Sequence, residues 1–292
     1  MFDNLTANQL DTLHTIFSVV SLIMGGMIGS FLNVCVSRMP QGLSVIKPRS
    51  RCPKCETPIT WYDNLPVISW LILGAKCRSC KTPISWQYPL VEAITGILFL
   101  LVFLKFGLTL ASPIYMILVA SLVLVTFIDL ADWTIPNEVT FPGMPLGIVC
   151  ALIAMMVPES GLHLDDPIMA IAGLFAGGGI LYGLDLLSLL LLKKRGMGFG
   201  DVKLLAMLGA FFGLWGVFLI IILASFFGSG IGITLILAGR KQTAVSEDDE
   251  EENVGHYLPF GPYIVMGGIV YLFYGPQIIE TYLSYINVPG VM

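Results

Sequence analysis

Long apolar runs separated by short polar segments dominate this chain of 292 residues. Such runs are typical of helices that cross a bilayer, each of which needs about 20 mostly apolar residues. The pattern therefore predicts an all-α polytopic integral membrane protein with about eight transmembrane helices. We expect the spans at residues 16–36, 89–106, 114–128, 139–157, 168–192, 202–212, 214–238 and 260–274.

The apolar run of residues 202–238 is the one whose division is hardest to assign. A single helix of that length would measure about 55 Å, which is too long for one span and short for two. Its glycines Gly209, Gly213 and Gly216 indicate a break in the middle. We therefore expect a short helix that ends near Phe212 and a second helix that begins near Leu214.

Composition agrees with this pattern, because 56% of the residues are hydrophobic, only 12% are charged and the mean hydropathy is +0.84. These values exclude a soluble domain of this size. Residues 1–15 contain Asp3 and Asp11 but no Lys or Arg, so we expect no cleavable signal peptide. The first apolar run should stay in the protein as a transmembrane helix.

The basic residues indicate how the chain crosses the membrane, because cytoplasmic loops carry an excess of Lys and Arg. With eight spans and an external N-terminus, 14 of the 15 basic residues lie on the cytoplasmic side and only Lys105 lies outside. The polar segment of residues 41–87 is then the first cytoplasmic loop. The same orientation places Asp129 and Asp201 at the cytoplasmic ends of their helices.

Four cysteines in that loop form two Cys-x-x-Cys pairs 21 residues apart, Cys52 with Cys55 and Cys77 with Cys80. This spacing is typical of a tetrahedral Zn²⁺ site, which would be structural because protein fills all four positions. Disulfides or a redox motif are the alternative, and the reducing cytoplasmic side argues against both. The remaining cysteines, Cys35 and Cys150, are expected to act as small buried hydrophobes.

A glycine-rich turn, Gly196-Met197-Gly198-Phe199-Gly200-Asp201, lies between two apolar runs and ends in a carboxylate. Ionisable groups at the edge of a membrane segment are costly and indicate function. Asp129, which closes the run of residues 114–128, is the matching partner, so the pair suggests an aspartyl dyad. Taken singly, Asp201 is equally well interpreted as a helix N-cap and Asp129 as part of a polar loop.

Two carboxylates that share a proton can hydrolyse a peptide bond, since one activates water while the other protonates the carbonyl oxygen. Gly198 and Gly200 would let a substrate backbone approach closely. The chain contains neither a His-Glu-x-x-His helix nor a Gly-x-Ser-x-Gly elbow. The glycine-rich turn follows a helix rather than a strand, which argues against a nucleotide cradle, and we expect no nucleic-acid partner.

Three other acidic features need an interpretation. Asp185 lies about 12 Å inside the preceding span by helical rise and is a rival dyad member or proton site. Glu92, near the start of the second span, is expected to face a polar groove or the zinc-binding loop. The acidic run from Glu247 to Glu252 is typical of a flexible, solvated loop.

Several motifs in order resemble those of type IV prepilin peptidases, and the resemblance covers nearly the whole chain. They are Gly29-Ser30-Phe31-Leu32-Asn33-Val34, the two cysteine pairs, Tyr88-Pro89-Leu90-Val91-Glu92, Asp129 followed by Ile135-Pro136, Gly198-Phe199-Gly200-Asp201-Val202-Lys203-Leu204-Leu205, and Pro259-Phe260-Gly261-Pro262.

The resemblance implies a bifunctional enzyme of the bacterial inner membrane. It would remove the basic leader from prepilins, or from type II secretion pseudopilins, on the cytoplasmic side, and N-methylate the new terminal residue with S-adenosylmethionine. Asp129 and Asp201 would be its catalytic residues, and the four paired cysteines its zinc ligands. Gly74 and Glu92 are our expectation for the neighbourhood of the methyl donor.

The expected domain organisation follows from these assignments. Residues 1–40 form the first transmembrane helix, residues 41–87 a zinc-binding loop associated with methyl transfer, and residues 88–292 a transmembrane aspartyl peptidase domain. Two alternatives stay open at this point. One is a proton or ion transporter that uses Asp129, Asp185 and Asp201 as a relay. The other is a pilin assembly factor that binds pilins without cutting them.

Overall fold

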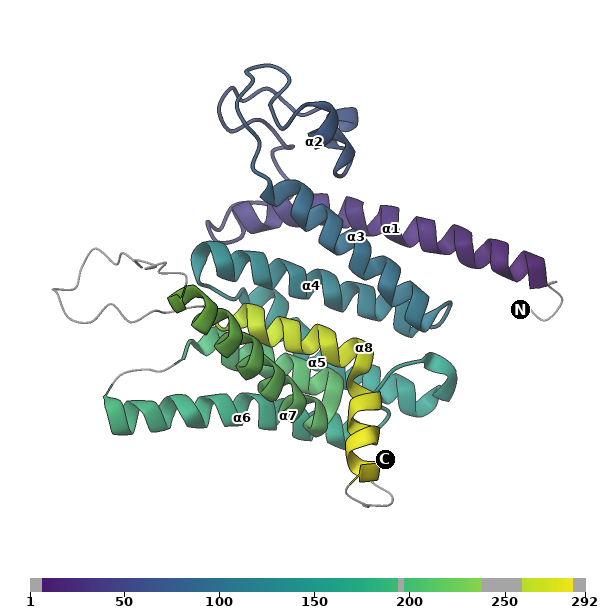
Figure 1. The fold of residues 1–292 in the computed structure, drawn as a ribbon, viewed down its shortest axis with the longest axis vertical. Coiled ribbons are helices and arrows are strands. Elements are labelled where there is room, and N and C mark those ends of the chain that lie inside the picture. Colours follow the sequence, from purple (N-terminus) through teal and green to yellow (C-terminus); the bar gives the residue numbers. More distant parts are fainter. Residues whose placement is uncertain (1–6, 194–196, 238–258, 286–292) are drawn as a thin grey trace. The chain divides into compact units, whose positions relative to one another are not determined.

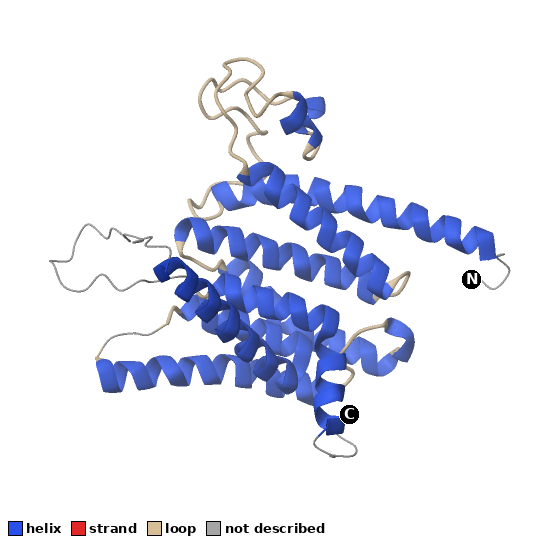
Figure 2. Cartoon of the chain, in the orientation of Figure 1, coloured by secondary structure: helices blue, strands red, loops and turns tan. Residues whose placement is uncertain are grey.

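The computed structural model describes residues 7–193, 197–237 and 259–285, and most of this part of the chain is helical (Figure 1). This part contains no strand, as the absence of red in Figure 2 shows. Its only β-type pairings are two isolated bridges. The acidic run of residues 247–252 and Gly196 lie outside the described residues. The prediction of an all-α fold is confirmed.

Seven helices in the described residues are long and apolar enough to cross a membrane, which confirms a polytopic membrane protein. They are α1 (Ala7–Arg38), α3 (Gln87–Phe106), α4 (Ala111–Asp132), α5 (Asn137–Met156), α6 (Pro167–Leu192), α7 (Phe199–Leu237) and α8 (Gly261–Tyr285). Short helical turns lie between them, namely η1 (Trp61–Asn64), α2 (Ile68–Ile72) and η2 (Pro158–Ser160).

Helix α7 is two helices joined at Gly213, whose backbone leaves the helical region with φ 70° and ψ −171°. Only glycine adopts this conformation readily. A methyl group on Gly209 would come within 2.9 Å of Val217 Cγ2, although eight residues span about 12 Å in a straight helix. The chain therefore folds back at Gly213, at the predicted position. With α7 counted as two halves, the described residues contain eight long apolar helical segments.

Several helix ends differ from the expected ones, because an apolar run marks the part of a helix that suits a membrane rather than its full length. The chain is already helical at Ala7, the first described residue, rather than from residue 16. Helix α8 continues to Tyr285 rather than to residue 274, passing through Pro276. Helix α4 extends past Ile128 to Asp132, so Asp129 lies in the helix and not after it.

The chain divides into two compact units, residues 1–128 with 156–162 and residues 129–155 with 163–292. In the first unit α1 packs along α3, and a methyl group on Gly25 would lie only 2.8 Å from the Cα of Gly96 (Figure 1). In the second unit α6 packs on α7, and α7 packs on α8. The functional domain boundaries at residues 40 and 88 stay a prediction. Cys35 and Cys150 are both buried, as expected.

Candidate active site

Asp129 is a buried carboxylate in the last turn of α4, with 5% of its surface exposed. Its Oδ2 atom has no hydrogen-bond partner among the described residues. The same atom lies so close to Gly261, at the start of α8, that a methyl group there would overlap it. A buried polar atom without a partner is costly, and such atoms concentrate where a ligand or a water molecule acts.

Asp201 is the second buried carboxylate of this unit, 8% exposed, and it lies in the first turn of α7. Its N–H donates to the carbonyl oxygen of Gly198 at 3.1 Å. Because α7 already begins at Phe199, Asp201 stands inside the helix rather than before it, and the N-cap interpretation is wrong. The positive end of the helix dipole still favours a carboxylate at this position.

Ile135 connects the surroundings of the two aspartates. A methyl group on Gly200 would lie 3.0 Å from Ile135 Cβ, and a methyl group on Gly261 would lie 3.2 Å from Ile135 Cδ1. The two carboxylates also interact electrostatically. The structure thus brings Asp129 and Asp201 into one cluster, which we call the carboxylate cluster: Asp129, Ile135, Gly200, Asp201 and Gly261. The catalytic role of the two aspartates stays a prediction.

The glycines of the turn differ in what surrounds them. Gly200 packs tightly on Ile135, whereas a methyl group on Gly198 would only touch Asp201 Oδ2 at 3.6 Å. A side chain at position 200 would therefore have to displace Ile135 by a few tenths of an ångström. Among the described residues, the space next to Gly198 and the Asp201 carboxylate is open, which suits the predicted approach of a substrate backbone.

Lys203 is a buried residue of this unit. In the sequence it counted only as one of the basic residues that indicate the membrane orientation. It is 9% exposed, its ammonium donates to Asn137 Oδ1, and it lies 5.6 Å from the ring centres of Phe141 and Phe199. These contacts tie the start of α7 to the start of α5. The only sequence signal was its place two residues after Asp201 in the resembling motif.

Asp185, the expected rival of the dyad, has a local structural partner. Its Oδ1 accepts a hydrogen bond of 3.2 Å from the N–H of Met197, in the glycine-rich turn. This contact holds the turn against α6 after the helix. A proton relay is not needed to account for Asp185.

The four paired cysteines of the first unit gather as predicted, with all four Sγ atoms within 4.8 Å of one another. Cys52 Sγ and Cys80 Sγ are 3.7 Å apart. A Zn–S distance of about 2.3 Å at tetrahedral geometry places sulfur atoms about 3.8 Å apart, so the cluster fits Zn²⁺. None of the described cysteines is in a disulfide.

The two cysteine pairs are equivalent halves of one lobe, since Cys-x-x-Cys-x-Thr-Pro-Ile occurs at residues 52–59 and again at residues 77–84. The hydrogen bonds repeat as well: the N–H of Cys52 donates to Thr57 at 3.0 Å, and that of Cys77 to Thr82 at 2.8 Å. Hydrogen bonds from the Thr82 side chain and backbone lower the pKa of Cys80 to about 6. A thiolate is the form that binds metal.

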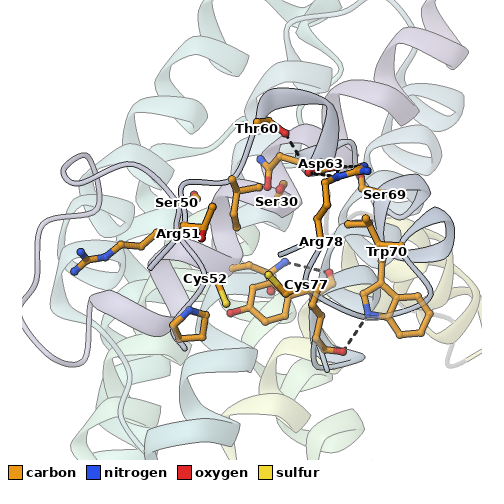
Figure 3. Close-up of a pocket in the computed structure, with 18 of the residues that line it drawn as sticks. Ser30, Ser50, Arg51, Cys52, Thr60, Asp63, Ser69, Trp70, Cys77 and Arg78 are labelled. Carbon is orange, nitrogen blue, oxygen red and sulfur yellow. Dashed lines mark hydrogen bonds and ion pairs between the residues drawn. The ribbon is translucent and has the colours of Figure 1, made fainter. Parts of the chain in front are cut away.

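A cavity of about 540 Å³ lies in the first unit between this lobe and the facing ends of α1 and α3 (Figure 3). Its polar lining includes Glu92, Asp63 and Arg78, and its aromatic lining includes Tyr62, Trp70 and Tyr88. Of these residues, the sequence indicated a role near the methyl donor only for Glu92, while Tyr88 appeared only as part of a resembling motif.

The two residues expected near the methyl donor are placed differently by the structure. Glu92 is 9% exposed, lines the cavity, and accepts a hydrogen bond of 2.7 Å from the N–H of Val67. Gly74 has φ +60° just after α2, is not among the lining residues, and a methyl group on it would meet nothing within 4 Å. The structure gives Gly74 the role of a turn, and its part in donor binding stays a prediction.

Comparison with known proteins gives matches along most of the chain. The family model described as the Bacterial Peptidase A24 N-terminal domain matches residues 23–106, and the model of the Type IV leader peptidase family matches residues 116–233. No solved structure matches the chain.

Several curated relatives carry the name prepilin leader peptidase/N-methyltransferase. That of Myxococcus xanthus is 36% identical over 84% of this chain and 70% of its own length. Those of Aeromonas salmonicida and Pseudomonas aeruginosa are 35% and 33% identical, each over 92% of this chain and 94% of their own length. With these relatives and two family models in the expected order, the chain belongs to the type IV leader peptidase family.

Proposed function

We propose that this protein is a membrane aspartic endopeptidase that removes the leader from type IV prepilins or pseudopilins and then N-methylates the new N-terminal residue. Family membership supports both activities. The observation that supports the peptidase assignment is the carboxylate cluster, where two buried aspartates from different helices are grouped around Ile135 and one Asp129 oxygen has no partner in the described residues.

The proposed hydrolysis uses Asp129 and Asp201 as acid and base. Two neighbouring buried carboxyl groups cannot easily ionise together, so one carries a proton while the other is charged. The charged group takes a proton from water, the water oxygen attacks the scissile carbonyl carbon, and the protonated group donates to the carbonyl oxygen. The group that took the proton from water then donates it to the amide nitrogen, and the other group takes back a proton from a hydroxyl of the tetrahedral intermediate. The C–N bond breaks, and the nitrogen leaves as the new α-amine. The room above Gly198 suits the extended backbone of the cleavage segment.

We propose the inner membrane as the location, with the carboxylate cluster at its cytoplasmic face. The distribution of basic residues supports this orientation. A leader rich in Lys and Arg would then meet two acidic side chains, while the apolar helix of the pilin remains in the bilayer. This arrangement accounts for acidic groups at the end of a membrane helix.

We propose Zn²⁺ as a structural ion on Cys52, Cys55, Cys77 and Cys80, and S-adenosylmethionine as methyl donor. The spacing of the sulfur atoms supports the ion. With four protein ligands the ion would stabilise the lobe and would take no part in the reaction. S-adenosylmethionine would supply an electrophilic methyl group.

The test is cleavage of a synthetic prepilin-like peptide, with a basic leader that ends in glycine before an apolar helix, by detergent-purified protein. Wild type is compared with Asp129→Asn and Asp201→Asn, which keep the size of each side chain but remove its acid–base function. Loss of general acid–base catalysis should lower turnover by about 10²- to 10⁴-fold in both variants.

Asp185→Asn is the matched control, because its amide oxygen can still accept the hydrogen bond from Met197. It should cleave at close to the wild-type rate. Equal loss in all three variants would contradict a dyad made of Asp129 and Asp201 alone. An intact peptide after incubation with folded, zinc-loaded wild type would favour an assembly factor that does not cut, or the transporter.

A further inference from the structure

The cavity beneath the cysteine lobe has the size and lining of a site for a small organic ligand. Its volume of about 540 Å³ falls within the range of about 300–1,000 Å³ typical of such sites. All of its lining residues belong to the first unit, and none belongs to the carboxylate cluster. A second chemical step would therefore have a site of its own.

The aromatic side chains of the cavity suit a flat, positively charged ligand. The indole Nε1 of Trp70 donates to the carbonyl oxygen of Ile84 at 3.2 Å, which fixes the ring (Figure 3). The ring of Tyr62 already has a cation near it, since the guanidinium carbon of Arg78 lies 5.8 Å from its centre. Aromatic faces bind both nucleobases and cations.

Charged groups of both signs face the same cavity. Asp63 and Arg78 form a two-pronged pair, with Nε to Oδ2 at 2.8 Å and Nη2 to Oδ1 at 2.5 Å (Figure 3). Arg51 points away from the other labelled side chains in that view. Arg38 also lines the cavity, and its Nη1 donates to the carbonyl oxygen of Ser44 at 3.0 Å. A lining with carboxylates and oriented guanidinium groups matches a ligand that carries a carboxylate together with positive charge.

Glu92 is held in place from two sides. A methyl group on Gly29 would lie 2.7 Å from the Cα of Glu92, so the backbone of α1 packs directly against the backbone of Glu92. The side chain of Glu92 accepts a hydrogen bond from the N–H of Val67. Val67 has φ 61° and ψ −47°, a backbone conformation that is costly for a β-branched residue. Backbone strain of this kind concentrates at ligand sites.

We infer that this cavity binds the methyl donor S-adenosylmethionine and that Glu92 presents its carboxylate to the α-amino group of the cleaved substrate. The inference rests on the proposed methyl transfer. The uncharged amine nitrogen forms a bond to the methyl carbon, the bond between that carbon and sulfur breaks, and its electron pair stays on sulfur as a neutral thioether. The nitrogen gives up one proton, which the Glu92 carboxylate accepts.

Donor binding is measured directly by equilibrium dialysis of labelled S-adenosylmethionine against the full-length, zinc-loaded protein in detergent. Tyr62→Ala removes an aromatic face from the cavity and should weaken binding by about 5- to 150-fold. Trp61→Ala is the matched control, because Trp61 is the neighbouring, exposed aromatic residue and does not line the cavity. Equal affinity of wild type and Tyr62→Ala would overturn the assignment of the cavity.

Glu92→Gln tests the carboxylate, because glutamine can still accept the N–H of Val67 but cannot accept a proton. Donor affinity should change by less than about threefold, while methylation of a peptide with an already free N-terminus should fall by about 10²- to 10⁴-fold. Glu56→Gln, an exposed change in the same lobe, should methylate normally. Full methylation by Glu92→Gln would overturn the role of Glu92.

Leader cleavage in the same preparations separates this inference from the proposed function. Tyr62→Ala and Glu92→Gln should both cleave at the wild-type rate. If wild type binds the donor and methylates the free peptide but does not cleave, the peptidase proposal fails and this inference holds. If wild type cleaves and methylates but Tyr62→Ala binds the donor normally, only the inference fails.

Discussion

The cysteine lobe and the carboxylate cluster position their functional groups in opposite ways. In the lobe, loops with repeated hydrogen bonds bring four thiols from two short segments to within 4.8 Å of one another. In the carboxylate cluster, helices group Asp129 and Asp201 around Ile135, because Gly200 and Gly261 leave room for the Ile135 side chain and the Asp129 carboxylate. The lobe would therefore depend on a bound ion for its order, whereas the helices of the carboxylate cluster depend on the absence of side chains at a few positions.

Removal of the ion should give the largest difference between the two regions. Cys52→Ser, or treatment of wild type with a strong chelator, should abolish zinc binding, which is worth about 10–16 kcal/mol in small zinc domains. Methylation should be lost with it, while leader cleavage and helix content by circular dichroism remain. The measurements are metal analysis and the two activity assays.

Cys35→Ala is the control for this change, since Cys35 is buried in α1 and lies outside the cysteine cluster. It should keep its zinc. Full zinc in Cys52→Ser would contradict the site, and loss of cleavage together with zinc would contradict the independence of the two regions.

A single methyl group should disturb the carboxylate cluster. In Gly261→Ala the new carbon would overlap Asp129 Oδ2 and press on Ile135. Because misplacement of a catalytic group by about 1 Å can cost about 10²-fold in rate, cleavage should fall by about 10- to 100-fold. Methylation of the free peptide should not change. In Gly183→Ala on α6 a methyl group meets nothing within 4 Å, and a comparable fall in that variant would contradict the explanation.

The fold-back within α7 should be sensitive to substitution in a different way. Gly213→Ala forces a side chain into a backbone conformation that only glycine adopts readily, at a cost of about 1–3 kcal/mol. The thermal midpoint in detergent should therefore fall clearly. Gly230→Ala, later in α7 and with open space around it, should leave the midpoint unchanged. Equal midpoints for the two variants would show that α7 does not turn at Gly213.

The smallest expected effect concerns the Asp63–Arg78 pair of the lobe. The Arg78 guanidinium holds the pKa of Asp63 below its usual value of about 3.9. Because the folded-state pKa is lowered, the stabilisation is fully present above the unfolded value and is lost only as pH falls through the folded value. Asp63→Asn should thus lower the thermal midpoint of the lobe, followed by tryptophan fluorescence, equally at pH 7, 6 and 5. A difference that disappears by pH 5 would contradict a lowered pKa.

Features with a regular period or spacing were predictable from the sequence. The apolar runs located all seven helices that could cross a membrane in the described part of the chain, and the two Cys-x-x-Cys pairs located the four neighbouring thiols. The break at Gly213 was predictable because a run of that length cannot be one span. The lengths by which α1 and α8 exceed their apolar runs were not, since hydropathy does not record how far backbone hydrogen bonding continues past such a run.

Contacts between distant segments could not be derived from the sequence. Ile135 and Gly261 lie far apart in the chain, and only the folded helices place both beside Asp129. Tyr62, Asp63 and Trp70 gave no signal either, because isolated aromatic and acidic residues in a loop have no characteristic spacing. The hydrogen bond from Met197 to Asp185 likewise depends on how the turn folds back on α6.

An ion bound by all four cysteines would cross-link two separate segments of the chain. Residues 56–76, which separate the two pairs, form a closed loop when all four thiols share one ion. Tyr62, Asp63 and Trp70 all lie within that loop and line the cavity. Binding of the ion and binding of a ligand that favours the closed loop are thermodynamically linked. If the ion raises the affinity of the protein for the ligand by some factor, the ligand raises the affinity of the protein for the ion by the same factor. Zinc retention during dialysis would then report on occupancy of the cavity without any chemical turnover.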